Sequence, residues 1–443
     1  MPTAPDLERF QTLLRIPTVS RVDKAAEDRP QFERFQQALV ECFPLVHAEL
    51  TREVIEGGAL LYRWPGGGVG APSVLMAHYD VVPADEPGWV HPPFAATLVG
   101  DGDEQRVWSR GTLDDKGALV AILEGVEARL AEGFRPAADV YLVFDDGEET
   151  AGAGAAAIVQ VLVDRGIRAG LVLDEGGAVV EGVFPGVSGQ LAVVGVTEKG
   201  LAGIELVVEK QGGHASTPAD DGATTRLARA ILKLERHPSR SFLSAPNVAM
   251  LETLGSRATG PLGHLMRNAG RYRRVFTGML DRLTPETRAM VRTTRAVTRL
   301  SGSAADNVIA ERATATINVR VAVGSTVDEA VADIRKAVSD PEVEVRLLYG
   351  SDPASVSVSQ GPAWETLSAS IEAIYPDALV TPYVMLQASD ARFFGRISDN
   401  VYRFLPFDLT AAERATLHAK DESIRVASYR RAIAFFTDLI GRL

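Results

Sequence analysis

Short apolar runs alternate with helical patterns along the first part of the chain. Residues 74–77, 140–144 and 171–173 are apolar runs bounded by Gly and Pro, and such runs predict buried strands. Residues 118–130 repeat apolar side chains at helical spacing and stop at Gly133, and residues 6–14 and 31–42 predict two further amphipathic helices. Strands that alternate with helices predict an α/β layered domain.

The pattern changes near residue 201 and returns near residue 352. Between these points we expect strands at 204–208, 313–321 and 342–348 and helices at 223–234 and 327–338. This order indicates a small α+β module inserted in the first domain. Residues 240–295, rich in Arg, Met and Leu, predict an added helical segment within it. The expected domains are therefore residues 1–195 with 352–443, and an inserted module at 196–351.

Composition narrows the possible partners and ligands. The chain has 443 residues, of which 46% are hydrophobic, and its formal net charge is −12. That acidic balance argues against a nucleic-acid partner, which requires a cationic face. Cys42 is the single cysteine, so an intramolecular disulfide and a thiolate metal site are excluded. We find neither a signal-peptide pattern nor a membrane-spanning run, and we expect a cytoplasmic protein without a membrane partner.

Each of the three predicted strands ends in residues that suit a metal ion. His78 and Asp80 follow the first strand, Glu148 and Glu149 the second, and Asp174 the third. In an open α/β sheet, ligands gather outside the carboxyl ends of the strands. We therefore expect these side chains to meet in one polar cluster, where His and carboxylates would be the metal ligands.

The spacing of these residues suggests roles for some of them. His78 and Asp80 share one face of a strand end, so His78 could bind a cation while Asp80 orients it. Glu148 and Glu149 point in different directions, so one can bind metal while the other acts as a general base. Taken singly, these motifs also fit a satisfied histidine, a solvated charged turn or, for Asp114, a carboxylate at a helix start.

Taken together, the motifs resemble the dinuclear zinc exopeptidases and aminoacylases, which include carboxypeptidase G, carnosinase and succinyl-diaminopimelate desuccinylase. The resemblance rests on the ordered residues His78-x-Asp80, Gly111-Thr112-Leu113-Asp114-Asp115-Lys116-Gly117, Glu148-Glu149, Asp174 and His418. Gly212-Gly213-His214, Asn307-Val308-Ile309 and Ile317-Asn318-Val319-Arg320 extend it into the inserted module. Met290-Val291-Arg292-Thr293-Thr294 and Tyr402-Arg403-Phe404-Leu405-Pro406 resemble the branch of carboxypeptidase S and the N-acyl amino acid hydrolases.

The resemblance implies a catalytic domain with a mixed central sheet flanked by helices, and two divalent metal ions. Zinc is the expected metal, although cobalt or manganese would suit the same ligands. Asp114 would bridge the two ions, with His78 and Asp174 on one ion and Glu149 and His418 on the other. The resemblance also implies a cis peptide bond between Asp114 and Asp115.

Roles for the remaining site residues also follow from the resemblance. Glu148 would be the general base. In the inserted module, a ferredoxin-like lid and dimerisation domain, His214 would reach the partner subunit's active site, and Asn307 and Arg320 would grip the substrate. Arg392 is a further candidate for binding a carboxylate, since a planar guanidinium can donate two parallel hydrogen bonds. The plainer alternatives are a surface histidine at His214 and an exposed strand residue at Arg320.

The expected activity is hydrolysis of an amide bond next to a free carboxylate in a small-molecule substrate, by a homodimer that pairs through the lid. We favour a Gly-Xaa-type carboxypeptidase or dipeptidase. The alternatives are an aminoacylase acting on N-acyl amino acids and an inactive metal-binding or interaction protein of the same fold. The chain departs from the family pattern at Gly147, at Thr150-Ala151 and at Ser109, which bears on loop geometry and substrate range but removes no ligand.

Overall fold

A mixed eight-stranded sheet forms the centre of the large domain. The computed structural model of the chain describes residues 4–84, 87–184, 186–218 and 220–443. In order across the sheet, the strands are β1 (Thr51–Ile55), β2 (Ala59–Trp64), β6 (Val140–Asp145), β3 (Ser73–His78), β7 (Leu171–Glu181), β16 (Val401–Asp408), β8 (Gln190–Glu198) and β15 (Leu379–Met385). β6, β3, β7 and β16 run parallel to one another, so their carboxyl ends meet at one edge.

Helices cover both faces of this sheet, because its side chains alternate between two apolar cores. Leu60 and Tyr62 on β2 belong to one core, and Leu61 between them belongs to the other. The first core is covered by α1 (Pro5–Leu14), α2 (Arg29–Cys42), α3 (Pro44–Glu49), α4 (Lys116–Ala131), α12 (Pro362–Ile374) and α15 (Val426–Arg442). The second is covered by α5 (Ala153–Asp164) and α13 (Ala391–Phe394). The expected mixed sheet flanked by helices is confirmed.

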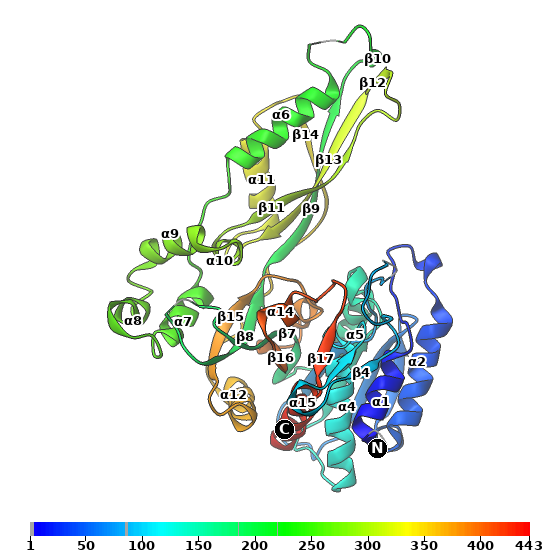
Figure 1. Cartoon of the computed structure of the whole chain (residues 1–443). Helices are drawn as coiled ribbons and strands as arrows, with labels where there is room; N and C mark the ends of the chain where they lie inside the picture. The colour runs from blue at the N-terminus through cyan, green and yellow to red at the C-terminus, as the bar shows by residue number, and fades with distance from the viewer. Residues whose placement is uncertain (1–3, 85–86, 185, 219) are drawn as a thin grey trace.

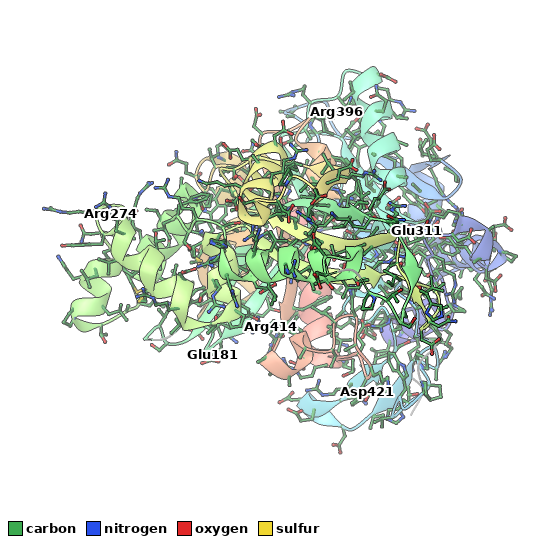
Figure 2. All side chains as sticks on the ribbon, turned by 90° about the horizontal axis from the view of Figure 1, so that it is seen from above. Glu181, Arg274, Glu311, Arg396, Arg414 and Asp421 are labelled. Atoms are coloured by element: carbon green, nitrogen blue, oxygen red, sulfur yellow. The ribbon has the colours of Figure 1, made fainter. Side chains whose placement is uncertain are left out.

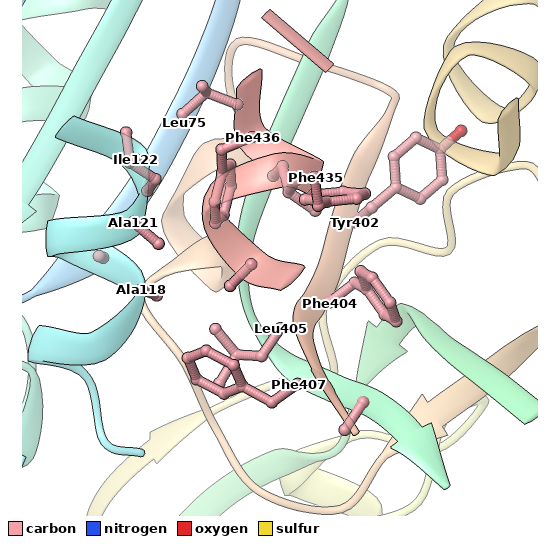
Figure 3. Close-up of a cluster of buried hydrophobic side chains, with 14 of the residues drawn as sticks. Leu75, Ala118, Ala121, Ile122, Tyr402, Phe404, Leu405, Phe407, Phe435 and Phe436 are labelled. Carbon is pink, nitrogen blue, oxygen red and sulfur yellow. The ribbon is translucent and has the colours of Figure 1, made fainter. Parts of the chain in front are cut away.

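Aromatic side chains fill the first core next to the edge of the sheet where the parallel strands meet. Figure 3 shows Phe404 and Phe407 of β16 in the same cluster as Phe435 and Phe436 of α15, opposite Ala118 and Ala121 of α4. The rings of Phe404 and Phe435 lie 5.7 Å apart, edge to face. This packing fixes α4, whose first turn directly follows Asp114 and Asp115.

The inserted module has a four-stranded antiparallel sheet with its own core. The strand order is β11 (Thr294–Ser301), β13 (Arg312–Val321), β9 (Gly200–Glu209) and β14 (Glu344–Ser351). One face is covered by α6 (Ala223–Arg236) and α11 (Val327–Val338), as the predicted order of elements indicated. β10 (Gly213–His214) and β12 (Val308–Ile309) pair at the tip of the module, the end farthest from the large domain (Figure 1).

The helical segment at residues 240–295 packs its buried side chains into the core of the large domain. It contains α7 (Ala245–Leu254), α8 (Gly260–Met266), α9 (Arg273–Leu283) and α10 (Pro285–Val291). Its buried side chains, among them Leu251 and Phe276, belong to the core of the eight-stranded sheet and not to that of the module. The segment therefore lies between the two bodies, as Figure 1 shows.

A small three-stranded sheet brings the C-terminal part of the chain to the edge where the parallel strands of the large sheet meet. Its strands are β17 (Ser423–Arg425), β5 (Arg106–Trp108) and β4 (Thr97–Val99). The remaining short elements are α14 (Ala411–Arg414) and the 3₁₀ turns η1 (Lys24–Ala26), η2 (Gly102–Glu104) and η3 (Glu148–Thr150). Because β17 pairs with β5, the loop carrying His418 lies beside the loop carrying Asp114. Within the described part of the chain, no helix is both long and apolar enough to cross a membrane.

Candidate metal centre

Three ligand-type side chains meet at the end of β3, beside an irregular position in the middle of β7. Ligand atoms of His78, Asp114 and Glu175 all lie within 4.8 Å of one another. His78 Nε2 is 2.9 Å from Asp114 Oδ1 and 3.7 Å from Glu175 Oε1. All three residues are buried or half-buried. One imidazole nitrogen and two carboxylates form a donor set that suits zinc and similar divalent ions.

A second group shares Asp114 with the first. Ligand atoms of Asp114, Glu149 and His418 also lie within 4.8 Å of one another. His418 Nε2 is 2.9 Å from Asp114 Oδ2 and 3.1 Å from Glu149 Oε1. The two oxygens of Asp114 therefore face different histidines, which is the arrangement expected of a carboxylate that bridges two ions. The residues present fit two divalent ions.

The charges of the cluster perturb one another strongly. Burial would lower the pKa of His78, but Glu175 and Asp114 outweigh burial and raise it well above its usual value. Asp114 and Glu149 raise the pKa of His418 to about 10. Burial opposes ionisation of Asp114, yet the two histidines hold the pKa of Asp114 far below its usual value. Burial raises the pKa of Glu175 well above the ordinary range. Cations in the cluster would relieve the excess of carboxylates.

Asp80 holds the two strand ends in position. Its carboxylate accepts hydrogen bonds from the backbone N–H groups of Glu148 and Glu149, each at 3.2 Å. The same carboxylate lies 3.3 Å from Nδ1 of His78, on the side of the ring opposite Asp114. Asp80 thus contacts both His78 and the turn that carries the two glutamates, and its contacts can hold their positions.

The loop that carries Asp114 is anchored by Glu422. This fully buried carboxylate accepts hydrogen bonds from the backbone N–H of Leu113 at 2.7 Å and from Arg110 Nη1 at 2.6 Å. Glu422 follows His418 by four residues, so the Glu422 carboxylate ties the two ligand loops together. Sequence analysis missed this role, and its only signal was a carboxylate close behind a candidate ligand histidine. The peptide bond between Asp114 and Asp115 is cis, as expected.

The third strand contributes Glu175 to the cluster, next in sequence to the expected Asp174. Asp174 is buried, and its Oδ2 accepts a hydrogen bond from the backbone N–H of Ala391 at 2.7 Å, on the side of α13. β7 bulges directly after it, since Asp174 pairs with Arg403 while the next paired residue is Gly177. The bulge redirects the Glu175 side chain toward His78. Asp174 stays a predicted ligand, and the geometry adds Glu175 as a candidate ligand beside His78.

Glu148 lies beside both groups without belonging to either. It is largely buried, and burial together with Glu149 and Asp114 raises its pKa to about 8, although His78 opposes the shift. A carboxyl group whose pKa lies near neutrality suits proton transfer. The role of Glu148 as general base stays a prediction.

Two arginines approach Glu148 from different domains. Arg392 Nη1 lies 4.0 Å from Glu148 Oε1, and its guanidinium is held by the carbonyl oxygens of Ser389 and Ala151. Arg320 of β13 has a buried Nη1 with no hydrogen-bond partner in the described structure. Burial lowers the pKa of Arg320, and Glu198 and Glu148 oppose that shift. Both guanidinium groups are placed to receive an anionic group near the cluster.

The other two predicted residues of the module lie away from the cluster of their own chain. His214 and Asn307 are exposed at the tip, where His214 pairs with Val308 and the Asn307 carbonyl accepts from the N–H of Ala215 at 3.1 Å. Figure 1 shows this tip far from the large domain. Within one chain, the structure does not bring His214 or Asn307 to the metal centre.

Comparison with known proteins gives consistent matches over nearly the whole chain. The family model described as peptidase family M20/M25/M40 matches residues 74–442. The chain is 32% identical to a probable carboxypeptidase S-like protein of Dictyostelium discoideum, over 99% of this chain and 85% of that protein. It is 31% identical to the N-fatty-acyl-amino acid synthase/hydrolase of Homo sapiens, over 98% of this chain and 86% of that protein.

Solved structures share the fold at lower identity. An M20 family metallo-carboxypeptidase of Sulfolobus solfataricus matches with a TM-score of 0.71 and 17% identity, over 99% of both chains. Human carnosine dipeptidase 1 matches with a TM-score of 0.67 and 14% identity, over 98% of this chain and 96% of that chain. At these identities the likeness establishes the architecture.

Two matched substitutions distinguish the acidic residues of β7. Glu175→Gln removes a carboxylate from the first group, and the metal content of the purified protein should fall from about two ions per chain to about one. Asp174→Asn keeps an oxygen acceptor for the Ala391 N–H and should retain both ions. Inductively coupled plasma mass spectrometry gives the metal content of each variant. Loss of an ion from Asp174→Asn, with both retained in Glu175→Gln, would identify Asp174 as the ligand and contradict the assignment of Glu175.

Proposed function

The chain belongs to peptidase family M20/M25/M40, and from that premise we propose that it hydrolyses an amide bond next to a free carboxylate at a centre of two divalent metal ions. The observation that carries the proposal is the pair of ligand groups that share Asp114, with Glu148 beside them. The five ligands proposed are His78, Asp114, Glu175, Glu149 and His418. We propose zinc as the metal, because two imidazoles and three carboxylates are ligands that zinc accepts.

The proposed chemistry divides between the ions and the protein. When bound, two divalent ions supply Lewis acidity to the amide carbonyl and bring the pKa of water toward roughly 7. Glu148 takes the proton of the attacking water and transfers it to the leaving amine, a role worth about 10²- to 10⁴-fold in rate. Asp80 holds His78 and the turn that carries Glu148 in fixed positions throughout the reaction.

The substrate carboxylate is bound by arginine in this proposal. Arg392 is fixed 4.0 Å from Glu148, and the buried Nη1 of Arg320 has no hydrogen-bond partner within the described residues. An unpaired buried donor is costly, and a substrate carboxylate would satisfy it with a charge-assisted hydrogen bond. A free carboxylate next to the cleaved amide is common to dipeptides, peptide C-termini and N-acyl amino acids.

A carboxypeptidase or dipeptidase of the Gly-Xaa type is the primary candidate, and an N-acyl amino acid hydrolase is the alternative. One structural observation favours the alternative. A pocket of about 420 Å³ adjoins Glu149 and is bordered by Val22, Ala26, Val82 and Pro83. Such a pocket can receive an apolar acyl group. Relatives of both kinds are known, since carboxypeptidase S of Saccharomyces cerevisiae and the human N-fatty-acyl-amino acid synthase/hydrolase both match the chain.

We further propose a homodimer that pairs through the inserted module, in which His214 and Asn307 complete the partner subunit's active site. The support is their exposed position at the tip of the module, away from the cluster of their own chain. The cytoplasmic location stays a prediction from the sequence.

A substrate screen with a matched inactive variant tests the proposed activity. The zinc-loaded protein is incubated with Gly-Xaa dipeptides and with N-acyl amino acids of increasing acyl length, and products are measured by mass spectrometry. Glu148→Gln should lose hydrolysis by at least about 10²-fold while it retains its metal, because the variant keeps every ligand but lacks the base. Full activity in Glu148→Gln would refute the assigned role. Turnover of dipeptides alone or of N-acyl amino acids alone decides between the two candidates.

A mixing experiment tests the contribution of His214 across the dimer. His214→Ala and Glu148→Gln are each expected to be nearly inactive. After the two are mixed and allowed to exchange subunits, half of the dimers carry one complete site, so activity should recover to about one quarter of wild type. Activity that stays at the sum of the separate variants would contradict a site completed by the partner subunit.

A further inference from the structure

A pocket of about 490 Å³ lies where the helical segment meets the inserted module. On one side it is lined by Asp281 and Arg282 of α9 and by Arg288 of α10, and on the other by Leu234 of α6 and Ile317 of β13. Leu234 and Ile317 belong to the core of the module, whereas α9 and α10 are anchored in the core of the large domain. The pocket therefore spans two separately packed bodies. It lies outside the metal centre, since none of the proposed ligands lines it.

Four arginines line this pocket, against two carboxylates. The arginines are Arg282, Arg288, Arg292 and Arg295, and the acidic residues are Asp281 and Glu235. The Asp281 carboxylate already has hydrogen-bond partners, because its Oδ1 accepts from Arg292 Nη2 and from Ser241 Oγ. In a chain with a net charge of −12, this is a local concentration of positive charge.

Much of the hydrogen-bonding capacity of these arginines is unused. Arg282 makes no hydrogen bond or ion pair with any residue that the structure describes. Arg288 donates its Nε to the backbone carbonyl of Asp281, which leaves both Nη groups available. Each free guanidinium edge can donate two parallel hydrogen bonds to an oxyanion.

Arg295 lies deeper in the pocket and is incompletely neutralised. Its side chain is 9% exposed, and Nη2 donates to the carbonyl oxygens of Leu234 and His237. Among the described residues, its single ion pair is a 3.5 Å contact with Asp333, whose Oδ2 also accepts a hydrogen bond from Ser239 Oγ. Burial lowers the pKa of Arg295, while Asp333 and Glu235 oppose the shift.

Two hydroxyl groups in the lining can also donate to a ligand. Thr293 Oγ1 accepts the backbone N–H of Ala322, and Thr294 Oγ1 accepts from Lys199 Nζ. Because both oxygens act as acceptors in these bonds, their own O–H groups remain free to donate. Guanidinium groups and hydroxyl groups around one cavity form a set of hydrogen-bond donors that suits phosphate groups.

We propose that this pocket binds a small phosphate-bearing anion that links the helical segment to the inserted module. The volume lies in the range of roughly 300–1,000 Å³ that is usual for small-molecule sites, so an organic body fits beside a phosphate. The bound anion would bridge arginines of α9 and α10 to Arg295 of β11. It would thereby stabilise one relative placement of the two bodies. This proposal does not depend on the proposed hydrolytic activity.

Titration calorimetry and thermal unfolding at fixed ionic strength test the site. The probes are inorganic phosphate and fructose 1,6-bisphosphate, and potassium chloride serves as the blank. We expect saturable binding of one equivalent per chain and a rise in Tm with probe concentration. Saturable binding of both probes identifies the phosphate group as the recognised element, and binding of the sugar bisphosphate alone shows that the organic body is also required.

A pair of double variants locates the binding. Arg282→Gln with Arg288→Gln should weaken binding by about tenfold or more, because free guanidinium donors are lost. Arg271→Gln with Arg274→Gln is the matched control. It removes the same charge from exposed arginines of the helical segment outside the pocket, and Figure 2 shows Arg274 at the outer edge of the molecule. Circular dichroism verifies that both variants are folded.

Three results would overturn the proposal. The first is the absence of saturable binding in the wild-type protein. The second is equal weakening in the two double variants, which would indicate general attraction to positive charge. The third is unchanged affinity in Arg282→Gln with Arg288→Gln, which would place the bound phosphate elsewhere, such as the metal centre that this variant leaves intact.

Discussion

Four carboxylates and two imidazoles converge at the carboxyl edge of the large sheet, and the rest of the molecule is arranged around this concentration of charge. Asp114 is shared by the two histidines, while Glu148, Glu149 and Glu175 crowd around it. Burial raises the pKa of each of these three glutamates because it disfavours the charged form, and the neighbouring carboxylates raise it further by repulsion between like charges. Such a cluster is stable when cations occupy it, because their charge offsets the repulsion between the carboxylates. The fold and the proposed chemistry therefore depend on the same bound ions.

The scaffold holds the cluster together through buried polar groups that lie outside the two ligand groups. Asp80 binds the Glu148–Glu149 turn, and Glu422 binds the Asp114 loop. Arg403 and Glu198 form a fully buried ion pair at 2.6 Å, and Glu198 also accepts a hydrogen bond from Ser389 Oγ, just before α13, the helix that carries Arg392. Each of these groups is paired, so together they can fix the ligand loops without leaving an isolated charge in the core.

Much of this arrangement could be predicted from the sequence, and the failures have physical causes. Apolar runs that end in His78, Glu148 and Glu149 identified the sheet edge, because parallel strands deliver their carboxyl ends to one place. The position of Glu175 beside His78 could not be predicted, since a bulge at β7 resets the side-chain alternation and depends on pairing with β16. Gly176, with φ of +139°, is the local sign of that bulge.

The helical segment at residues 240–295 was recognised from its composition, but its amphipathic pattern does not say which of the two cores it joins. Glu422 acts across more than 300 residues of sequence, a distance over which no local pattern operates.

The most direct test of the account is anomalous X-ray diffraction at the zinc edge from crystals of the zinc-loaded protein. A two-ion centre predicts two anomalous peaks per chain. One peak should lie at the ligand atoms of His78 and Glu175 and the other at those of Glu149 and His418, with Asp114 next to both. A single peak, or two peaks that do not share Asp114, would contradict the two-ion centre.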